Sequence, residues 1–81
     1  MTREEIITKL TPIVREMLQD ETLIINEDMS PANVASWTSM SFMMMLKEIE
    51  NQFSIEFKMM EILRLQNMGA IIAAIEAKTN A

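Results

Sequence analysis

Apolar residues recur at helical spacing in three separate stretches of this 81-residue chain, and no other feature limits its fold as strongly. Each stretch forms an apolar stripe along one side of a helix, and such a stripe must be buried against another element. The chain holds one glycine and two prolines, too few turn residues for an all-β fold. We therefore expect one all-α domain over residues 1–81. The stripes are Ile6, Ile7, Leu10, Ile13, Val14, Met17 and Leu18; Phe42, Met45, Leu46, Ile49 and Phe53; and Met68, Ile71, Ile72 and Ile75.

The first helix is predicted to begin at Thr2, because Thr2 and Glu5 fit the reciprocal capping pattern of threonine followed three places later by glutamate. Pro12 lies inside this stretch and removes one helical hydrogen bond. Either the helix kinks there, or Thr11 caps a second segment that opens with Pro12. Because the stripe stays in phase across the proline, we favour a kink. The second helix is predicted from Ser39 to about Phe53.

A short third helix is predicted over residues 58–64, after an extended link at 54–57 that resembles a half-buried strand. Asn67 is expected to cap the last helix, which runs to about Lys78. Gly69, in its first turn, is expected to weaken that helix by about 1 kcal/mol relative to alanine. The third helix offers three side chains to the core, namely Met59, Ile62 and Leu63.

Residues 19–37 show no helical period and predict a long loop, a feature that is uncommon in compact domains and usually functional. A side-chain-stabilised turn is expected near residues 30–33. The predicted architecture is thus a four-helix bundle with three longer helices, one short helix and a long loop between the first and second helices. Several apolar loop residues are candidates to pin the loop to the helices: Leu23, Ile24, Ile25, Met29, Val34 and Trp37.

The composition excludes several classes of chemistry. The chain has no cysteine and no histidine, so it cannot form a zinc site or a Cys–His or Ser–His nucleophile pair from its own residues. The acidic loop residues do not fit a calcium loop either, because an EF-hand starting at Asp20 would place Ile25 where glycine is required. No carboxylate or lysine constellation suggests acid–base catalysis. We therefore expect neither an enzyme nor a metal site.

The charge and the hydropathy limit the partners. The net charge of −5 disfavours nucleic acid, which needs clustered lysine and arginine, and favours partners with basic patches. The longest apolar runs, residues 42–46 and 68–75, fall far short of the roughly 20 residues of a membrane span. The first residues do not resemble a signal peptide. A monomeric, cytoplasmic protein is expected.

The tetrapeptide Trp37-Thr38-Ser39-Met40 places a serine hydroxyl where the second helix starts. A serine before an apolar run is most often a helix cap, but Thr38 can fill that role and leave Ser39 at the first helical position. Free N–H groups and partial positive charge there favour an anion such as a phosphodiester. With the segments 46–53 and 65–72, this motif resembles the acyl carrier protein family, in which it usually reads Asp-Ser-Leu.

The resemblance implies both a fold and a function. It implies a bundle of acyl-carrier type in which a phosphopantetheinyl transferase moves 4'-phosphopantetheine from coenzyme A to Ser39. The protein would then hold acyl intermediates as thioesters for fatty acid, polyketide or specialised lipid biosynthesis. Its other partners would be acyl-processing enzymes, namely synthases, ligases or transferases. Two alternatives stay open: a peptidyl carrier protein, and an unmodified helical adaptor that binds partners through exposed methionines.

Family members usually carry several acidic residues along the second helix, whereas this chain offers only Glu48 and Glu50 there. We therefore expect docking to be more apolar and less electrostatic than in the family. Flexible thioethers could also border a deformable cavity for an acyl chain, although filling gaps in the core is their more common role. The docking candidates are Thr38, Met40, Ser41, Met44, Lys47 and Glu48, and the cavity candidates are Met43, Met45, Met59 and Met60.

Overall fold

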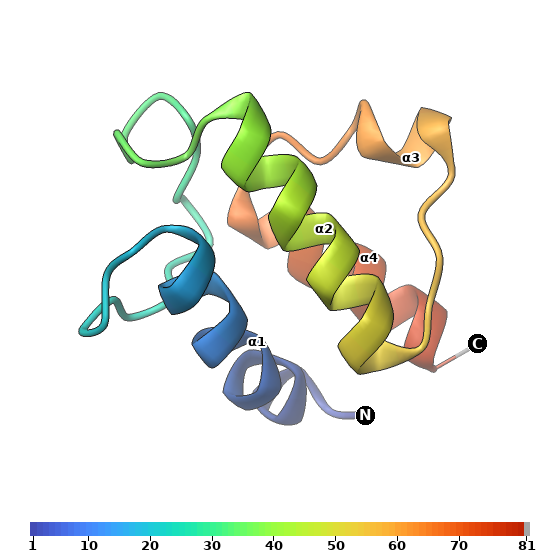
Figure 1. The fold of residues 1–81 in the computed structure, drawn as a ribbon. Coiled ribbons are helices and arrows are strands. Elements are labelled where there is room, and N and C mark those ends of the chain that lie inside the picture. The colour runs from blue at the N-terminus through green and yellow to red at the C-terminus, as the bar shows by residue number, and fades with distance from the viewer. Residues whose placement is uncertain (81) are drawn as a thin grey trace.

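The computed structural model describes residues 1–80, which form four helices in the predicted order (Figure 1). Helices α1 and α2 pack against each other, and α1 also packs against α4. The all-α fold with one short helix and a long first loop is therefore confirmed. Within residues 1–80 no helix has the length and apolar character needed to cross a membrane. The helices are α1 (Arg3–Met17), α2 (Ser39–Phe53), α3 (Met59–Ile62) and α4 (Met68–Thr79).

The core is built from the predicted apolar stripes of the three longer helices. Among the described residues it contains no buried polar or charged side chain. The stripe of α4 is completely enclosed, since all four of its predicted residues are buried. Because the chain is short, five residues from outside the helices complete this core: Leu18, Met29, Trp37, Phe57 and Leu65.

Helix α1 begins as predicted and continues through its proline. Thr2 Oγ1 accepts a hydrogen bond from Glu5 N at 3.1 Å, and the Glu5 carboxylate accepts one from Thr2 N at 2.8 Å. Pro12 lies inside a single helix, so no second segment starts at Thr11. The Thr11 hydroxyl instead donates to the carbonyl of Ile7 at 2.6 Å. The in-phase apolar stripe outweighs the hydrogen bond that Pro12 cannot make.

Helix α3 is shorter than predicted, and its apolar residues face outward. Met59 and Leu63, expected in the core, are 73% and 64% exposed, and only Ile62 packs against the core. The reason is the ion pair between the Glu61 carboxylate and Lys78 of α4, whose atoms are 2.7 Å apart. This pair directs the Glu61 side of α3 toward α4. The link at 54–57 forms no strand, although Phe57 within it is buried.

The long loop is fixed to α4 by its backbone. The N–H groups of Met68 and Gly69 donate to the carbonyls of Met29 and Glu27 at 2.8 and 2.9 Å. These donors belong to the first turn of α4, where a helix has no acceptors of its own. The prediction that some apolar loop residues anchor the loop is confirmed, since Met29 and Trp37 are buried, whereas Ile24 is 82% exposed. The loop therefore follows a definite path to the start of α2.

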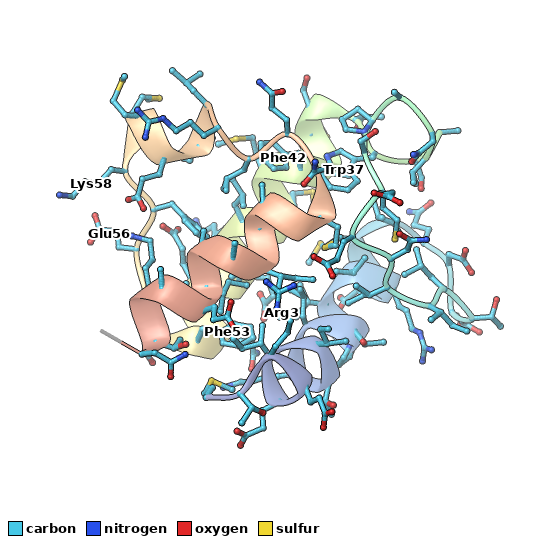
Figure 2. The ribbon with its side chains drawn as sticks, turned by 180° about the vertical axis from the view of Figure 1, so that it is seen from behind. Arg3, Trp37, Phe42, Phe53, Glu56 and Lys58 are labelled. Carbon is cyan, nitrogen blue, oxygen red and sulfur yellow. The ribbon has the colours of Figure 1, made fainter. Side chains whose placement is uncertain are left out.

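Two further contacts set the last part of that path. In the predicted turn, Ser30 N donates to Asn33 Oδ1 at 2.9 Å and Val34 N donates to the Ser30 carbonyl at 3.0 Å. Trp37 is buried and stacks on Phe42 of α2, with ring centroids 6.1 Å apart. Figure 2 shows the two rings side by side at one end of the bundle. The residue before the cap of α2 is thus held by the core.

Candidate functional site: the start of helix α2

Ser39 is the first residue of α2, and its side chain is exposed. The helix is capped by Thr38, whose Oγ1 accepts a hydrogen bond from Ser41 N at 3.1 Å. None of the hydrogen bonds within residues 1–80 uses the Ser39 hydroxyl. Because Thr38 takes the capping role, the hydroxyl of Ser39 is reachable from outside.

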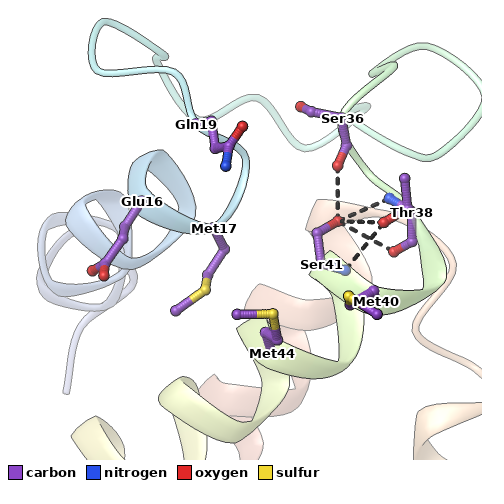
Figure 3. Close-up of a pocket in the computed structure, with 8 residues that line it drawn as sticks. All are labelled: Glu16, Met17, Gln19, Ser36, Thr38, Met40, Ser41 and Met44. Atoms are coloured by element: carbon purple, nitrogen blue, oxygen red, sulfur yellow. Dashed lines mark hydrogen bonds between the residues drawn. The ribbon is translucent and has the colours of Figure 1, made fainter.

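Ser41 completes this cap in a way that the sequence reading missed. Its Oγ accepts a hydrogen bond from Thr38 N at 2.8 Å and donates one to the carbonyl of Ser36, also at 2.8 Å (Figure 3). The signal was present in the sequence, since a polar residue three places after a capping threonine is typical of a capping box. Ser41 was expected to contact partners, but its hydroxyl is used in hydrogen bonds that cap the start of α2.

The start of α2 suits an anionic substituent. Within residues 1–80 the backbone N–H groups of Ser39 and Met40 have no acceptor. The first turn of α2 carries no acidic residue, so nothing there opposes the partial positive charge of the helix end. A phosphate ester on Ser39 would meet two free donors and no adjacent carboxylate.

The remaining docking candidates lie on the outward side of α2. Met40 and Met44 are 74% and 53% exposed, and Lys47 is exposed as well. Glu48 is less accessible, since it is half-buried. Its carboxylate also accepts a hydrogen bond from Gln52 Nε2 at 2.9 Å within the same helix. The accessible surface that begins at Ser39 is accordingly formed by thioethers and one cation.

The four cavity candidates do not come together around one cavity. Met45 is fully buried in the core, whereas Met43, Met59 and Met60 are exposed. Two positions along a helix correspond to a rotation of about 200°, so Met43 and Met45 must point to nearly opposite sides. Met43 instead lines a surface pocket of about 410 Å³ between α2 and Ile62 of α3.

A second hollow, the α1–α2 groove, lies between the end of α1 and the start of α2 (Figure 3). Its volume is about 460 Å³. The sequence could not predict it, because the periodicity of each helix says nothing about which ends meet. The groove is lined by Glu16, Met17, Gln19, Ser36, Thr38, Met40, Ser41 and Met44.

A search of solved structures finds the holo acyl carrier protein of Geobacter metallireducens, determined in solution by NMR. The TM-score is 0.84 and the sequence identity 26%, over 91% of this chain and 85% of that chain. No protein-family model matches the chain, and no curated protein matches it significantly. The family resemblance of the sequence is thus supported by the fold. The four helices, the long pinned loop and the serine at the start of α2 give this chain the fold of the acyl carrier protein family.

Proposed function

We propose that this protein is a carrier that bears 4'-phosphopantetheine on Ser39 and holds acyl intermediates as thioesters. The observation that carries the proposal is the free, exposed hydroxyl of Ser39 at the first position of α2. It occurs in a fold shared with a holo acyl carrier protein over nearly the whole chain. A carrier role also agrees with a chain that has no cysteine and no histidine with which to attack its own cargo.

The residues around Ser39 fit the group. When bound, it supplies the thiol that this chain lacks. The N–H groups of Ser39 and Met40 are available to the oxygens of a phosphodiester, and the end of α2 adds favourable partial charge. Thr38 and Ser41 keep the first turn of the helix intact while Ser39 is modified, because their mutual hydrogen bonds do not involve it.

The attachment step is a phosphoryl transfer on a partner transferase. The Ser39 oxygen forms a new bond to the phosphorus next to the pantetheine moiety of coenzyme A. The bond between that phosphorus and the bridging oxygen breaks, and adenosine 3',5'-bisphosphate leaves. The serine proton passes to a base of the transferase or to water. Ser39 contributes the nucleophile, and no other residue of this chain is required to take part in the bond changes.

The outward side of α2 supports a docking mode that relies on apolar contacts. Met40, Met43 and Met44 are exposed, whereas the only acids of α2, Glu48 and Glu50, are engaged within the chain. The transferase and the acyl-processing enzymes would therefore bind with little dependence on salt, because screening weakens exposed charge pairs but not apolar burial. Strong salt dependence of docking would contradict this mode. Fatty acid, polyketide and specialised lipid synthesis are the pathways such a carrier would serve.

Intact mass after co-expression with a phosphopantetheinyl transferase tests the function. We expect the mass to rise by one phosphopantetheine group and the increase to disappear in Ser39→Ala. Ser36→Ala is the matched control, since Ser36 is also exposed and accepts the Ser41 hydrogen bond through its backbone. A protein that stays unmodified with several transferases would refute the proposal. It would favour the adaptor, for which the exposed methionines of α2 and α3 are the supporting observation.

A further inference from the structure

We propose that the α1–α2 groove is the resting site of the prosthetic arm and the adjoining part of its acyl cargo. The inference rests on the proposed function, and it places the cargo on the surface between α1 and α2. Thr38 and Met40, the two neighbours of Ser39, both line the groove. A substituent on Ser39 therefore starts at the groove's edge. The volume of about 460 Å³ lies within the range of small-molecule sites, which is roughly 300–1,000 Å³.

Three thioether side chains give the groove an apolar wall, although Glu16 and several hydroxyl-bearing residues also line it. Met17 comes from the last turn of α1, and Met40 and Met44 come from successive turns of α2. Figure 3 shows these three thioether side chains bordering the same opening. Methionine side chains are flexible and polarizable, so they can adapt to saturated chains of different length. The exposure of Met40 and Met44 in the absence of cargo leaves apolar area that a chain on the groove would cover.

The rim of the groove offers a polar group suited to an amide-containing arm. Gln19 lies just past α1, and none of the hydrogen bonds within residues 1–80 uses its side chain. An amide side chain both donates and accepts, as each amide of the arm does. Gln19 adopts the left-handed conformation (φ 55°), which closes α1 with the bond from Asp20 N to the Arg15 carbonyl at 2.9 Å. Glycine is the usual residue in this left-handed position after a helix. The turn itself therefore does not need the side chain of Gln19.

The pocket on the opposite side of α2 is less well placed. It shares Met44 with the α1–α2 groove, and neither neighbour of Ser39 belongs to it. Its other lining residues are Met43, Leu46, Lys47, Glu50 and Ile62. Its lining residue closest to Ser39 in the sequence is Met43, a full turn further along α2. A group tethered at Ser39 thus meets the α1–α2 groove first.

Methyl NMR of protein labelled at its methionines tests the inference. The apo, holo and octanoyl-loaded forms are compared, and intact mass first confirms loading at Ser39, so failure of the carrier function is recognised separately. We expect shift changes on loading at the methyls of Met17, Met40 and Met44, with nuclear Overhauser contacts from the octanoyl chain to Met17. Contacts to Met43 or Ile62, or no contact with any methionine, in a loaded sample would overturn the inference.

Two variants separate groove binding from a general effect of loading. Met40→Gln replaces an exposed methionine that lines the groove but not the pocket on the other side of α2, and Met60→Gln replaces an exposed methionine of α3 as the matched control. We expect the loading-induced shift at Met17 to fall to less than half in Met40→Gln and to stay unchanged in Met60→Gln. Gln19→Gly keeps the left-handed turn but removes the amide, and we expect contacts from the arm's amide protons to be lost. Equal effects of Met40→Gln and Met60→Gln would refute the assignment.

Discussion

At the scale of single residues, different hydroxyl groups at the start of α2 cap the helix and remain free. Thr38 and Ser41 form the cap, with hydrogen bonds of 3.1 and 2.8 Å, and Ser39 between them is left unbonded. A single serine could not do both, because a capping hydroxyl is directed at the helix and is engaged by its N–H groups. Threonine where the family usually has aspartate therefore preserves the geometry of the site but removes a charge from it.

Loss of either capping hydroxyl is expected to lower stability while leaving Ser39 in place. Thr38→Ala and Ser41→Ala should each reduce the free energy of unfolding by about 1 kcal/mol, as measured by urea denaturation. Thr38→Asp should keep the cap and add about 0.3–1 kcal/mol of stability through the interaction of its charge with the helix dipole. Ser39→Ala is the control, since its hydroxyl makes no hydrogen bond within residues 1–80. A loss in Ser39→Ala equal to that in Thr38→Ala would contradict this division of tasks.

At the scale of elements, the loop and α4 stabilise each other through Gly69. The residue donates its N–H to the Glu27 carbonyl at 2.9 Å, and a Cβ added to it would lie 3.2 Å from Glu27 Cβ and 3.3 Å from Glu27 O. The Glu27 backbone has little freedom to move away, because its carbonyl accepts the hydrogen bond from the Gly69 N–H. Glycine at position 69 thus permits a close approach of the loop and α4 that a Cβ would crowd.

Gly69→Ala is therefore expected to destabilise the protein, although alanine favours a helix by about 1 kcal/mol over glycine. Overpacking at this contact is expected to outweigh that gain and leave a net loss of about 1 kcal/mol, seen as a lower Tm. Ala73→Gly, at an exposed position of the same helix, is the control and should cost about 1 kcal/mol through propensity alone. A higher Tm for Gly69→Ala would contradict this prediction, because it would show that the loop at Glu27 can move to accommodate the added Cβ.

The extent to which the sequence predicts these elements follows from the range of each interaction. The starts of α1, α2 and α4 depend on residues three places apart, so Thr2, Thr38 and Asn67 could be identified as caps. The contact of Gly69 with Glu27 joins residues far apart in the chain, and periodicity carries no trace of it. The outward orientation of α3 likewise depends on the pairing of Glu61 with Lys78, seventeen residues later. The α1–α2 groove could not be predicted for the same reason, whereas the position of Ser39 at the start of α2 was predicted because its signal is local.

At the scale of the whole molecule, ion pairs link α1 to α4 and connect the long loop and α3 to these helices. Arg3 of α1 reaches both Glu27 of the loop and Glu76 of α4, at 2.8 and 3.3 Å, and Figure 2 shows it between α1 and α4. On the other side, the pair of Lys78 with Glu61 ties α3 to α4. These pairs are partly exposed, so each contributes modestly and is weakened by salt. Two of them hold segments outside the three longer helices, since one fixes the loop and another fixes the single turn of α3.

The pair on α3 gives a test that depends on pH. Hydrogen bonds from the Lys78 ammonium, and then from Lys58 N–H, hold the pKa of Glu61 below its ordinary value of 4.5. Because the folded pKa is the lower one, the stabilisation is fully present above pH 4.5 and is lost as the pH falls through the lowered value. Glu61→Gln should therefore have a lower Tm than the parent protein at pH 7, and the difference should vanish in acid. Glu56→Gln is the control, since Glu56 is exposed and makes no ion pair within residues 1–80. If both variants lost equal stability at pH 7, or if the Glu61→Gln difference persisted once the Glu61 carboxylate was protonated, the pairing of α3 with α4 would not be what holds that turn in place.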